Sequence, residues 1–394
     1  MSSCIEHWAK TFTLLALTVS TPSSLIAKAN EGWLFLVEQV SGERLIKYVE
    51  DLVAFKTRYA LSGGANFSAK YLYRYFSTLR GFNVSFHLFP LPLEDRRVGL
   101  NVVACKPGVR ESAGHILLFA HYDSVSNDPY ASAPGADDNA SGVAVMMEAA
   151  YVMSLYDWNR TLIFTAFSGE EIGFIGSSAW AKENEDLLKN VVGGVCLDGV
   201  GRGETVSIMY ADEQSKALAD LTLNVSIMLG FKDFREVASV LGVEGSDSHV
   251  FLERGLKVIR LWDEDATSIH SPLDLPETLY PNRLVETCKV ITATLHLLLT
   301  ESFKDLYPGK TVKLKNEGAR SLLLAAVLAS SPTFLLIYTL LKWRKRFPSS
   351  QRWVKTTLTA YISGIDSPFI FDQPSNHKLS KDEILGSLRC RNEH

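Results

Sequence analysis

Cysteine is scarce in this chain, which has five in 394 residues. Cys4 and Cys390 lie near the two ends, so the central part keeps Cys105, Cys196 and Cys288. Three thiols form at most one disulfide, which excludes a disulfide-stapled scaffold. We expect Cys196, which lies in an apolar run, to pack as a small buried thiol.

The chain also lacks a strong excess of one charge and a visible internal repeat. Its formal net charge is −4 at pH 7, which gives no electrostatic basis for binding nucleic acid. The absence of a repeat disfavours a solenoid. The length of residues 30–310 suits one large domain around a single core, and we predict one there.

Short apolar runs define the expected centre of this domain. Ile116–Ala120, Thr161–Phe167 and Val191–Leu197 are typical of strands buried on both faces of a parallel sheet. The remaining expected elements are helices at 43–60, 69–79, 142–156 and 282–303 and strands at 83–90 and 101–105. This order predicts an α/β fold with a mixed, mostly parallel central sheet flanked by helices.

Histidine and acidic side chains follow the ends of the three runs. His121 follows the first run, the pair Glu170-Glu171 the second, and Asp198 the third. Because the carboxyl ends of parallel strands meet at one edge of a sheet, these side chains can converge. Imidazole and carboxylate groups are the ligands of catalytic zinc. Each residue alone is more typical of an ordinary loop or surface, so only their joint occurrence indicates a metal centre.

Five short motifs follow one another along the chain. They are His121-Tyr122-Asp123-Ser124, Gly135-Ala136-Asp137-Asp138-Asn139-Ala140-Ser141-Gly142, Glu170-Glu171, Val195-Cys196-Leu197-Asp198 and His270-Ser271-Pro272. Their order and wording resemble the co-catalytic di-zinc aminopeptidase family, whose relatives include bacterial leucyl aminopeptidase, plasma glutamate carboxypeptidase and glutaminyl cyclase. The likeness covers about residues 43–303. It implies peptide substrates and a zinc exopeptidase, most simply an aminopeptidase.

The resemblance implies a role for each motif residue. Asp138 would bridge two Zn²⁺ ions per chain because a carboxylate has two oxygens. His121 and Asp198 would complete one zinc position, and Glu171 and His270 the other.

Two further residues would support these ligands. Glu170 resembles the family's general base, which takes a proton from water. Asp123 resembles the carboxylate that orients the imidazole of His121. The resemblance also implies a cis peptide bond at Asp138–Asn139.

Two polar segments occur between Asp198 and His270 in the sequence. Many relatives have Ser-Asp-His where this chain has Ser246-Asp247-Ser248-His249. Because of the extra serine, we expect His249 to shape the site wall rather than to catalyse. Asp263-Glu264-Asp265 is expected to be a solvated turn; alternatively, one of its carboxylates meets the α-ammonium group of a substrate.

Three alternatives to an aminopeptidase stay open. A glutaminyl cyclase-like acyltransferase, which would use one zinc, shares the fold, but the segment after Glu170-Glu171 lacks the insertion of those enzymes. A carboxypeptidase or dipeptidase of the same family is compatible with the motifs. A non-enzymatic membrane scaffold on this fold is disfavoured because all the expected ligand types are present.

The first 29 residues resemble a secretory signal. An apolar stretch, Thr11–Val19, precedes the small-x-small pattern Ala27-Lys28-Ala29. That stretch is too short to cross a bilayer. An amphipathic N-terminal helix is the alternative, which the uninterrupted apolar run disfavours. We predict a signal peptide at 1–29.

One run near the other end is long enough to cross a membrane. About twenty uncharged residues, Leu322–Leu341, precede the basic cluster Lys342–Arg346, as on the cytoplasmic side of membrane spans. A buried core helix is the alternative. We predict a transmembrane helix at 321–341 and a cytosolic tail at 342–394. The protein would then be a single-pass membrane protein of the secretory pathway, with its catalytic domain in the lumen or outside the cell.

Glycosylation sequons agree with this topology. They begin at Asn66, Asn83, Asn159 and Asn224. A fifth, at Asn139, lies inside a metal motif, and we expect it to remain unmodified.

Overall fold

The computed structural model describes residues 33–92, 97–110, 113–264 and 267–300. The predicted signal peptide, transmembrane helix and tail lie outside these ranges. Within them, no helix is long and apolar enough to span a bilayer.

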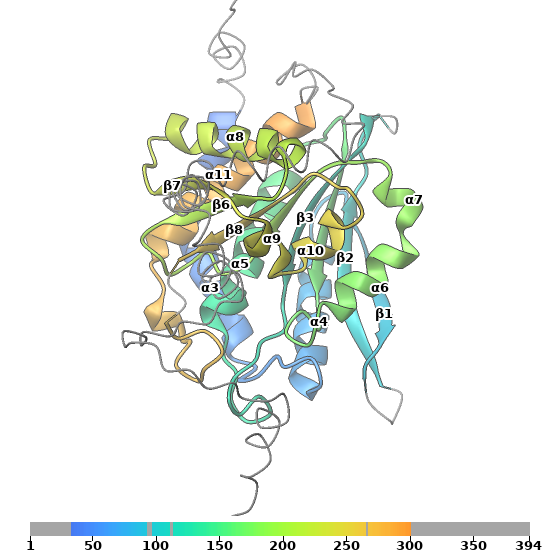
Figure 1. The fold of residues 1–394 in the computed structure, drawn as a ribbon, viewed down its shortest axis with the longest axis vertical. Helices are drawn as coiled ribbons and strands as arrows, with labels where there is room; N and C mark the ends of the chain where they lie inside the picture. The colour runs from blue at the N-terminus through green and yellow to red at the C-terminus, as the bar shows by residue number, and fades with distance from the viewer. Residues whose placement is uncertain (1–32, 93–96, 111–112, 265–266, 301–394) are drawn as a thin grey trace, which may run out of the picture. The chain divides into compact units, whose positions relative to one another are not determined.

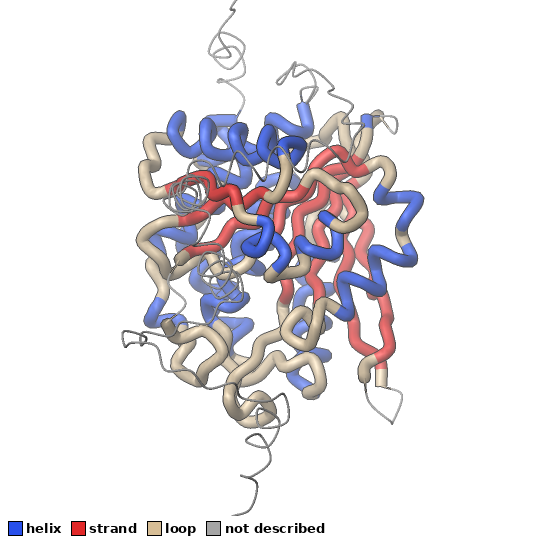
Figure 2. Tube along the Cα trace, viewed as in Figure 1, coloured by secondary structure: helices blue, strands red, loops and turns tan. Residues whose placement is uncertain are grey.

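One eight-stranded sheet forms the centre of the domain, in the order β1-β2-β4-β3-β5-β8-β6-β7 (Figure 2). Its strands are β1 (Asn83–Pro90), β2 (Val98–Lys106), β3 (His115–His121), β4 (Thr161–Phe167), β5 (Val191–Leu197), β6 (Val206–Tyr210), β7 (Phe234–Ala238) and β8 (Val258–Asp263). β4, β3, β5 and β8 run parallel to one another, and β6 is parallel to β7. β1, β2 and β4 pair antiparallel, as do β6 and β8. The prediction of a mixed, mostly parallel sheet is confirmed.

Helices cover both faces of the sheet (Figure 1). The helices are α3 (Gly42–Val53), α4 (Gly63–Ser77), α5 (Gly142–Ser154), α6 (Ile175–Glu183), α7 (Glu185–Leu188), α8 (Glu213–Met228), α9 (Val240–Glu244), α10 (Ser248–Leu252) and α11 (Pro281–Thr300), with the short turns η2 (Ala136–Ser141) and η3 (Pro276–Thr278). Side chains of α3, α4, α5, α8 and α11 share one apolar core, and those of α6 and α10 share a second. The sheet therefore separates two hydrophobic layers.

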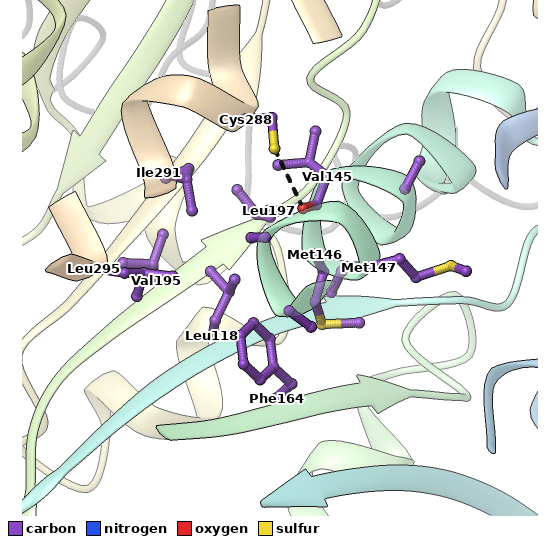
Figure 3. Close-up of a cluster of buried hydrophobic side chains, with 14 of the residues drawn as sticks. Leu118, Val145, Met146, Met147, Phe164, Val195, Leu197, Cys288, Ile291 and Leu295 are labelled. Carbon is purple, nitrogen blue, oxygen red and sulfur yellow. Dashed lines mark hydrogen bonds between the residues drawn. The ribbon is translucent and has the colours of Figure 1, made fainter. Parts of the chain in front are cut away.

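The alternation of side chains along the central strands explains why both faces are buried. Leu118 of β3 and Phe164 of β4 contact the α5 side, whereas Leu117 and Phe119 belong to the opposite core. Figure 3 shows the α5 side, where Cys288 of α11 lies against α5 and its thiol points to the carbonyl of Val145, 3.9 Å away. Such fully buried strands must be apolar throughout, which is the pattern in the sequence.

Two helix boundaries differ from the prediction by about six residues or more. α3 ends at Val53 rather than at residue 60, because Lys56 takes a positive φ of 64° and Thr57 pairs with Ala133. α4 begins at Gly63, before the predicted residue 69. At Gly64 a Cβ would lie 1.9 Å from the carbonyl oxygen of Thr57, so close packing requires glycine there.

Cys105, Cys196 and Cys288 are free thiols. No disulfide occurs in the described part of the chain. Cys196 is buried, as predicted.

Candidate metal centre

Polar side chains lie at the ends of three central strands, at one edge of the sheet. His121 is the last residue of β3, not the first after it, and pairs with Phe167 at the end of β4. Asp198 directly follows β5, which is hydrogen-bonded to β3. Parallel alignment thus brings together groups that are 77 positions apart in the chain.

The first cluster consists of His121, Asp138 and Asp198. The Nε2 atom of His121 lies 3.2 Å from Oδ1 of Asp138 and 3.1 Å from Oδ1 of Asp198. All three side chains are buried, and their candidate ligand atoms lie within 4.8 Å of one another.

The second cluster uses the other oxygen of the same aspartate. His270 Nε2 lies 3.1 Å from Oδ2 of Asp138 and 3.1 Å from Oε2 of Glu171. His270 stands at the solvent side of the centre, since its side chain is 54% exposed. Asp138 therefore faces the first cluster with Oδ1 and the second with Oδ2, the arrangement expected of a bridging carboxylate.

A bound cation would balance the negative charge of the buried carboxylates in this group. Oε1 of Glu171 is buried without a hydrogen-bond partner. Burial, reinforced by the charge of Asp138, raises the pKa of Glu171 to about 7. The pKa of His270 rises to about 10 because it is hydrogen-bonded to Asp138 and Glu171. Two imidazoles and several buried carboxylates are a donor set that fits zinc, which would supply the missing charge.

Glu170 lies beside both clusters. It can be grouped with His121 and Glu171 within the same 4.8 Å limit. Burial raises the pKa of its carboxyl group well above the ordinary value. A carboxylate in this position can accept a proton.

Asp123 holds the Glu170-Glu171 turn, and its carboxylate also lies beside the imidazole of His121. Its two carboxylate oxygens accept hydrogen bonds from the backbone N–H groups of Glu170 and Glu171, both at 3.3 Å. Nδ1 of His121 instead contacts the backbone oxygen of Asp123 at 3.1 Å, while the carboxylate lies 3.7 Å away. The resemblance implied that the carboxylate of Asp123 orients the imidazole of His121. The backbone oxygen of Asp123 makes the shorter contact with that ring.

A missed carboxylate, Asp274, fixes the backbone at Asp138. Its oxygens accept hydrogen bonds from the N–H groups of Asp137 at 2.9 Å and Asp138 at 3.0 Å. The bond Asp138–Asn139 is cis, as the resemblance implied. The sequence feature that could have identified Asp274 is its position four residues after His270, within the same short turn.

A second missed residue, Arg260, contacts Asp198 directly. Nη2 of Arg260 lies 3.1 Å from Oδ2 of Asp198, so Oδ1 is left for the first cluster. The guanidinium stacks on Trp262 at 4.7 Å and donates to the carbonyl of Gly242 at 2.8 Å. An arginine flanked by apolar residues in β8 is the sequence feature that could have identified it.

The polar segment 246–249 lies next to the centre but outside both clusters. Asp247 is buried and accepts a hydrogen bond from the hydroxyl of Ser177 at 2.5 Å. His249 lies 6.1 Å from the ring of Phe174 and 3.5 Å from Glu253. That His249 shapes the wall of the site stays a prediction.

The acidic segment 263–265 is not a solvated turn throughout. Asp263 is fully buried and accepts a hydrogen bond from the N–H of Arg202 at 2.7 Å. Glu264 pairs with Arg235 and Ser207. Asp265 lies outside the described residues. Asp263 and Glu264 therefore serve the fold, because their oxygens are engaged by neighbouring elements.

The family of the chain follows from comparison with known proteins. The sequence pattern of peptidase family M28 matches residues 101–295, which hold every candidate ligand. Residues 101–295 therefore belong to peptidase family M28. The aminopeptidase YwaD of Bacillus subtilis is 31% identical over 210 residues, which are 50% of this chain and 43% of that protein. A probable zinc metalloprotease of Pyrenophora tritici-repentis is 30% identical over 189 residues, which are 43% of this chain and 44% of that protein. The chain spans less than half the length of these curated M28 relatives.

Solved structures of M28-like enzymes share the fold. A zinc aminopeptidase from Bacillus subtilis superimposes with a TM-score of 0.60 at 17% identity, covering 66% of this chain and 96% of that one. The Porphyromonas gingivalis glutaminyl cyclase has a TM-score of 0.56 at 19% identity, covering 65% and 98%. These identities establish the fold and leave the reaction to be argued from the site.

Proposed function

We propose that this M28 protein is an aminopeptidase that hydrolyses the N-terminal peptide bond of peptides at a centre of two zinc ions. The shared aspartate carries the proposal, because Asp138 turns one oxygen to each cluster. One zinc position would use His121, Asp138 and Asp198, and the other Asp138, Glu171 and His270. The M28 relatives named as zinc metalloproteases support this metal.

The zinc ions and the protein side chains would have different roles in the reaction. Zinc ions bound here would lower the pKa of a water molecule and polarise the scissile carbonyl. Glu170 would accept the proton of that water and return it to the leaving amine. Asp123 would keep Glu170 in place through the backbone hydrogen bonds of the Glu170-Glu171 turn.

Two alternatives use the same fold. A glutaminyl cyclase is a structural neighbour. An enzyme with one zinc would need only one cluster of ligands, however, and this site has two that share Asp138. A carboxypeptidase or dipeptidase would need a cation for the substrate's carboxylate. Arg260, close to the clusters, already pairs with Asp198.

The test of the function is the requirement for a free α-amine. We expect aminoacyl-fluorophore substrates to be cleaved and their N-acetylated counterparts to be refused, because the amine must reach the acidic centre. Release of fluorophore from both forms at matched concentrations is the measurement. Equal rates for the two forms, or release only from a peptide's C-terminal end, would exclude an aminopeptidase while leaving a zinc hydrolase possible.

We also propose the single-pass topology and a lumenal or extracellular domain. The sequons at Asn66, Asn83 and Asn224 are exposed and that at Asn159 is half-buried, whereas Asn139 is fully buried. Glycans could therefore be accepted at the first four and not at the last.

Topology can be tested in cells and microsomes. We expect glycosidase treatment to lower the apparent mass, and protease added to sealed microsomes to remove the residues after Arg346. Detergent-opened microsomes serve as the control for protease activity. A tail that stays protected until detergent is added would contradict the orientation.

A further inference from the structure

The loop from His121 to Asp138 carries two candidate ligands and rests on a segment that lies earlier in the chain. Lys56–Arg58 precede residues 101–295, which match the M28 pattern. Thr57 pairs with Ala133 of the loop. Arg58 is fully buried beneath the loop. Part of the support for these two ligands thus comes from outside the matched region.

The guanidinium of Arg58 joins the two ends of this loop. Its Nε donates to the carbonyl of Tyr122 at 2.8 Å, directly after His121. Nη1 donates to Pro134 at 2.5 Å and Nη2 to Gly135 at 2.7 Å, just before Asp138. One planar group therefore fixes the distance between the two backbone segments that carry His121 and Asp138.

Neighbouring contacts reinforce the same connection. The backbone N–H of Arg58 donates to Oγ of Ser124 at 3.2 Å, and that hydroxyl donates to the carbonyl of Ala133 at 2.6 Å. The hydroxyl of Thr57 donates to Pro129 at 2.6 Å. The loop is held along its length, so a shift of one end would be transmitted to the other.

The positive charge of Arg58 is balanced by the carboxylates of the metal centre and not by a carboxylate that pairs with it directly. Within the described ranges, no salt bridge joins Arg58 to a carboxylate, and its donors go to backbone carbonyls. Burial lowers the pKa of Arg58 to about 10, opposed by the charges of Asp274, Asp123 and Asp138. The guanidinium stays protonated at neutral pH.

We propose that Arg58 is a positioning residue of the metal centre, which holds the His121–Asp138 loop so that both ligands reach the same ion. The inference rests on the proposed two-zinc function. Lysine cannot replace arginine here, because one ammonium group cannot reach carbonyls at both ends of the loop in a fixed plane.

The experiment measures zinc affinity of the full chain by competition with a chelator. For Arg58→Lys we expect zinc binding to weaken about 10–100-fold, the range typical of groups that support metal ligands. The matched control is Arg160→Lys. Arg160 also donates to backbone carbonyls, those of Ala113 at 2.8 Å and Leu298, but it precedes β4 at the opposite end of the strand from the centre. Its variant should keep wild-type affinity.

Thermal unfolding separates positioning from simple support of the fold. At a fixed zinc concentration, the rise in Tm grows with the logarithm of zinc's affinity for the folded state. In Arg58→Lys the zinc-induced rise should shrink, whereas a purely structural role would lower Tm equally with and without zinc. If Arg58→Lys fails to fold, Ser124→Ala, which removes one contact of the same connection, should show a smaller loss of zinc affinity.

The outcomes are distinguishable. Wild-type protein without tight zinc would overturn the proposed centre and this inference with it. Wild-type zinc affinity in Arg58→Lys, or in Ser124→Ala when Arg58→Lys does not fold, would overturn the role of Arg58 alone. So would equal losses in Arg58→Lys and Arg160→Lys.

Discussion

Glu170→Gln is expected to lower kcat about 10²–10⁴-fold, the usual contribution of a general base. The variant keeps the size of the side chain and removes only the ability to accept a proton. Because Glu170 is adjacent to a candidate ligand without belonging to the two clusters that share Asp138, zinc content and Tm should remain near wild type. The loss corresponds to about 3–5 kcal/mol of transition-state stabilisation.

The matched variant is Glu171→Gln at the next position. It removes a charge from the second cluster, where Oε2 of Glu171 lies 3.1 Å from His270, so it should weaken zinc binding first. Kinetics at saturating zinc and metal analysis on both variants form the measurement. A Glu170→Gln protein with near-normal kcat would refute the base assignment.

Asp138→Asn is expected to empty both zinc positions and abolish activity. Its two oxygens serve different clusters, and a neutral amide with one carbonyl oxygen cannot replace a charged bridge. No other single ligand variant should have this effect, because His121 and Asp198 belong to one cluster and Glu171 and His270 to the other.

Asp137→Asn is the control for this variant. Asp137 is equally buried, and its Oδ1 accepts a hydrogen bond from the N–H of Gly201 at 2.9 Å. Asparagine keeps that acceptor oxygen, so zinc content should remain close to wild type. Retention of one full zinc equivalent by Asp138→Asn would contradict the bridging role.

Apolar runs predicted the central strands well because burial on both faces leaves no other choice of residue. β1, β4 and β5 have the predicted bounds. Residues 206–238, which form β6, α8 and β7, were not assigned to elements, since the short edge strand β7 mixes charged and apolar residues. The end of α3 was placed too late because the pairing of Thr57 with Ala133, which ends it, is a tertiary contact.

The candidate site was also predicted only in part from the sequence. Three of the five candidate ligands, His121, Glu171 and Asp198, were recognisable because they stand at or shortly after strand ends. Asp138 and His270 were recognisable from their motifs and their order in the chain. Asp274, Arg260 and Arg58 were missed because they act through hydrogen bonds to backbone groups or to another side chain. Spacing in the sequence does not record such contacts, whose partners lie up to 137 residues away for Asp274.

The number of zinc ions bound to the purified full-length protein tests the proposed centre most directly. Metal analysis after dialysis, on protein of verified fold, should give two equivalents per chain, and removal by chelator should abolish cleavage of free aminoacyl substrates until zinc is restored. One tight equivalent, unchanged by added zinc, would contradict the two-zinc aminopeptidase and favour the cyclase-like alternative.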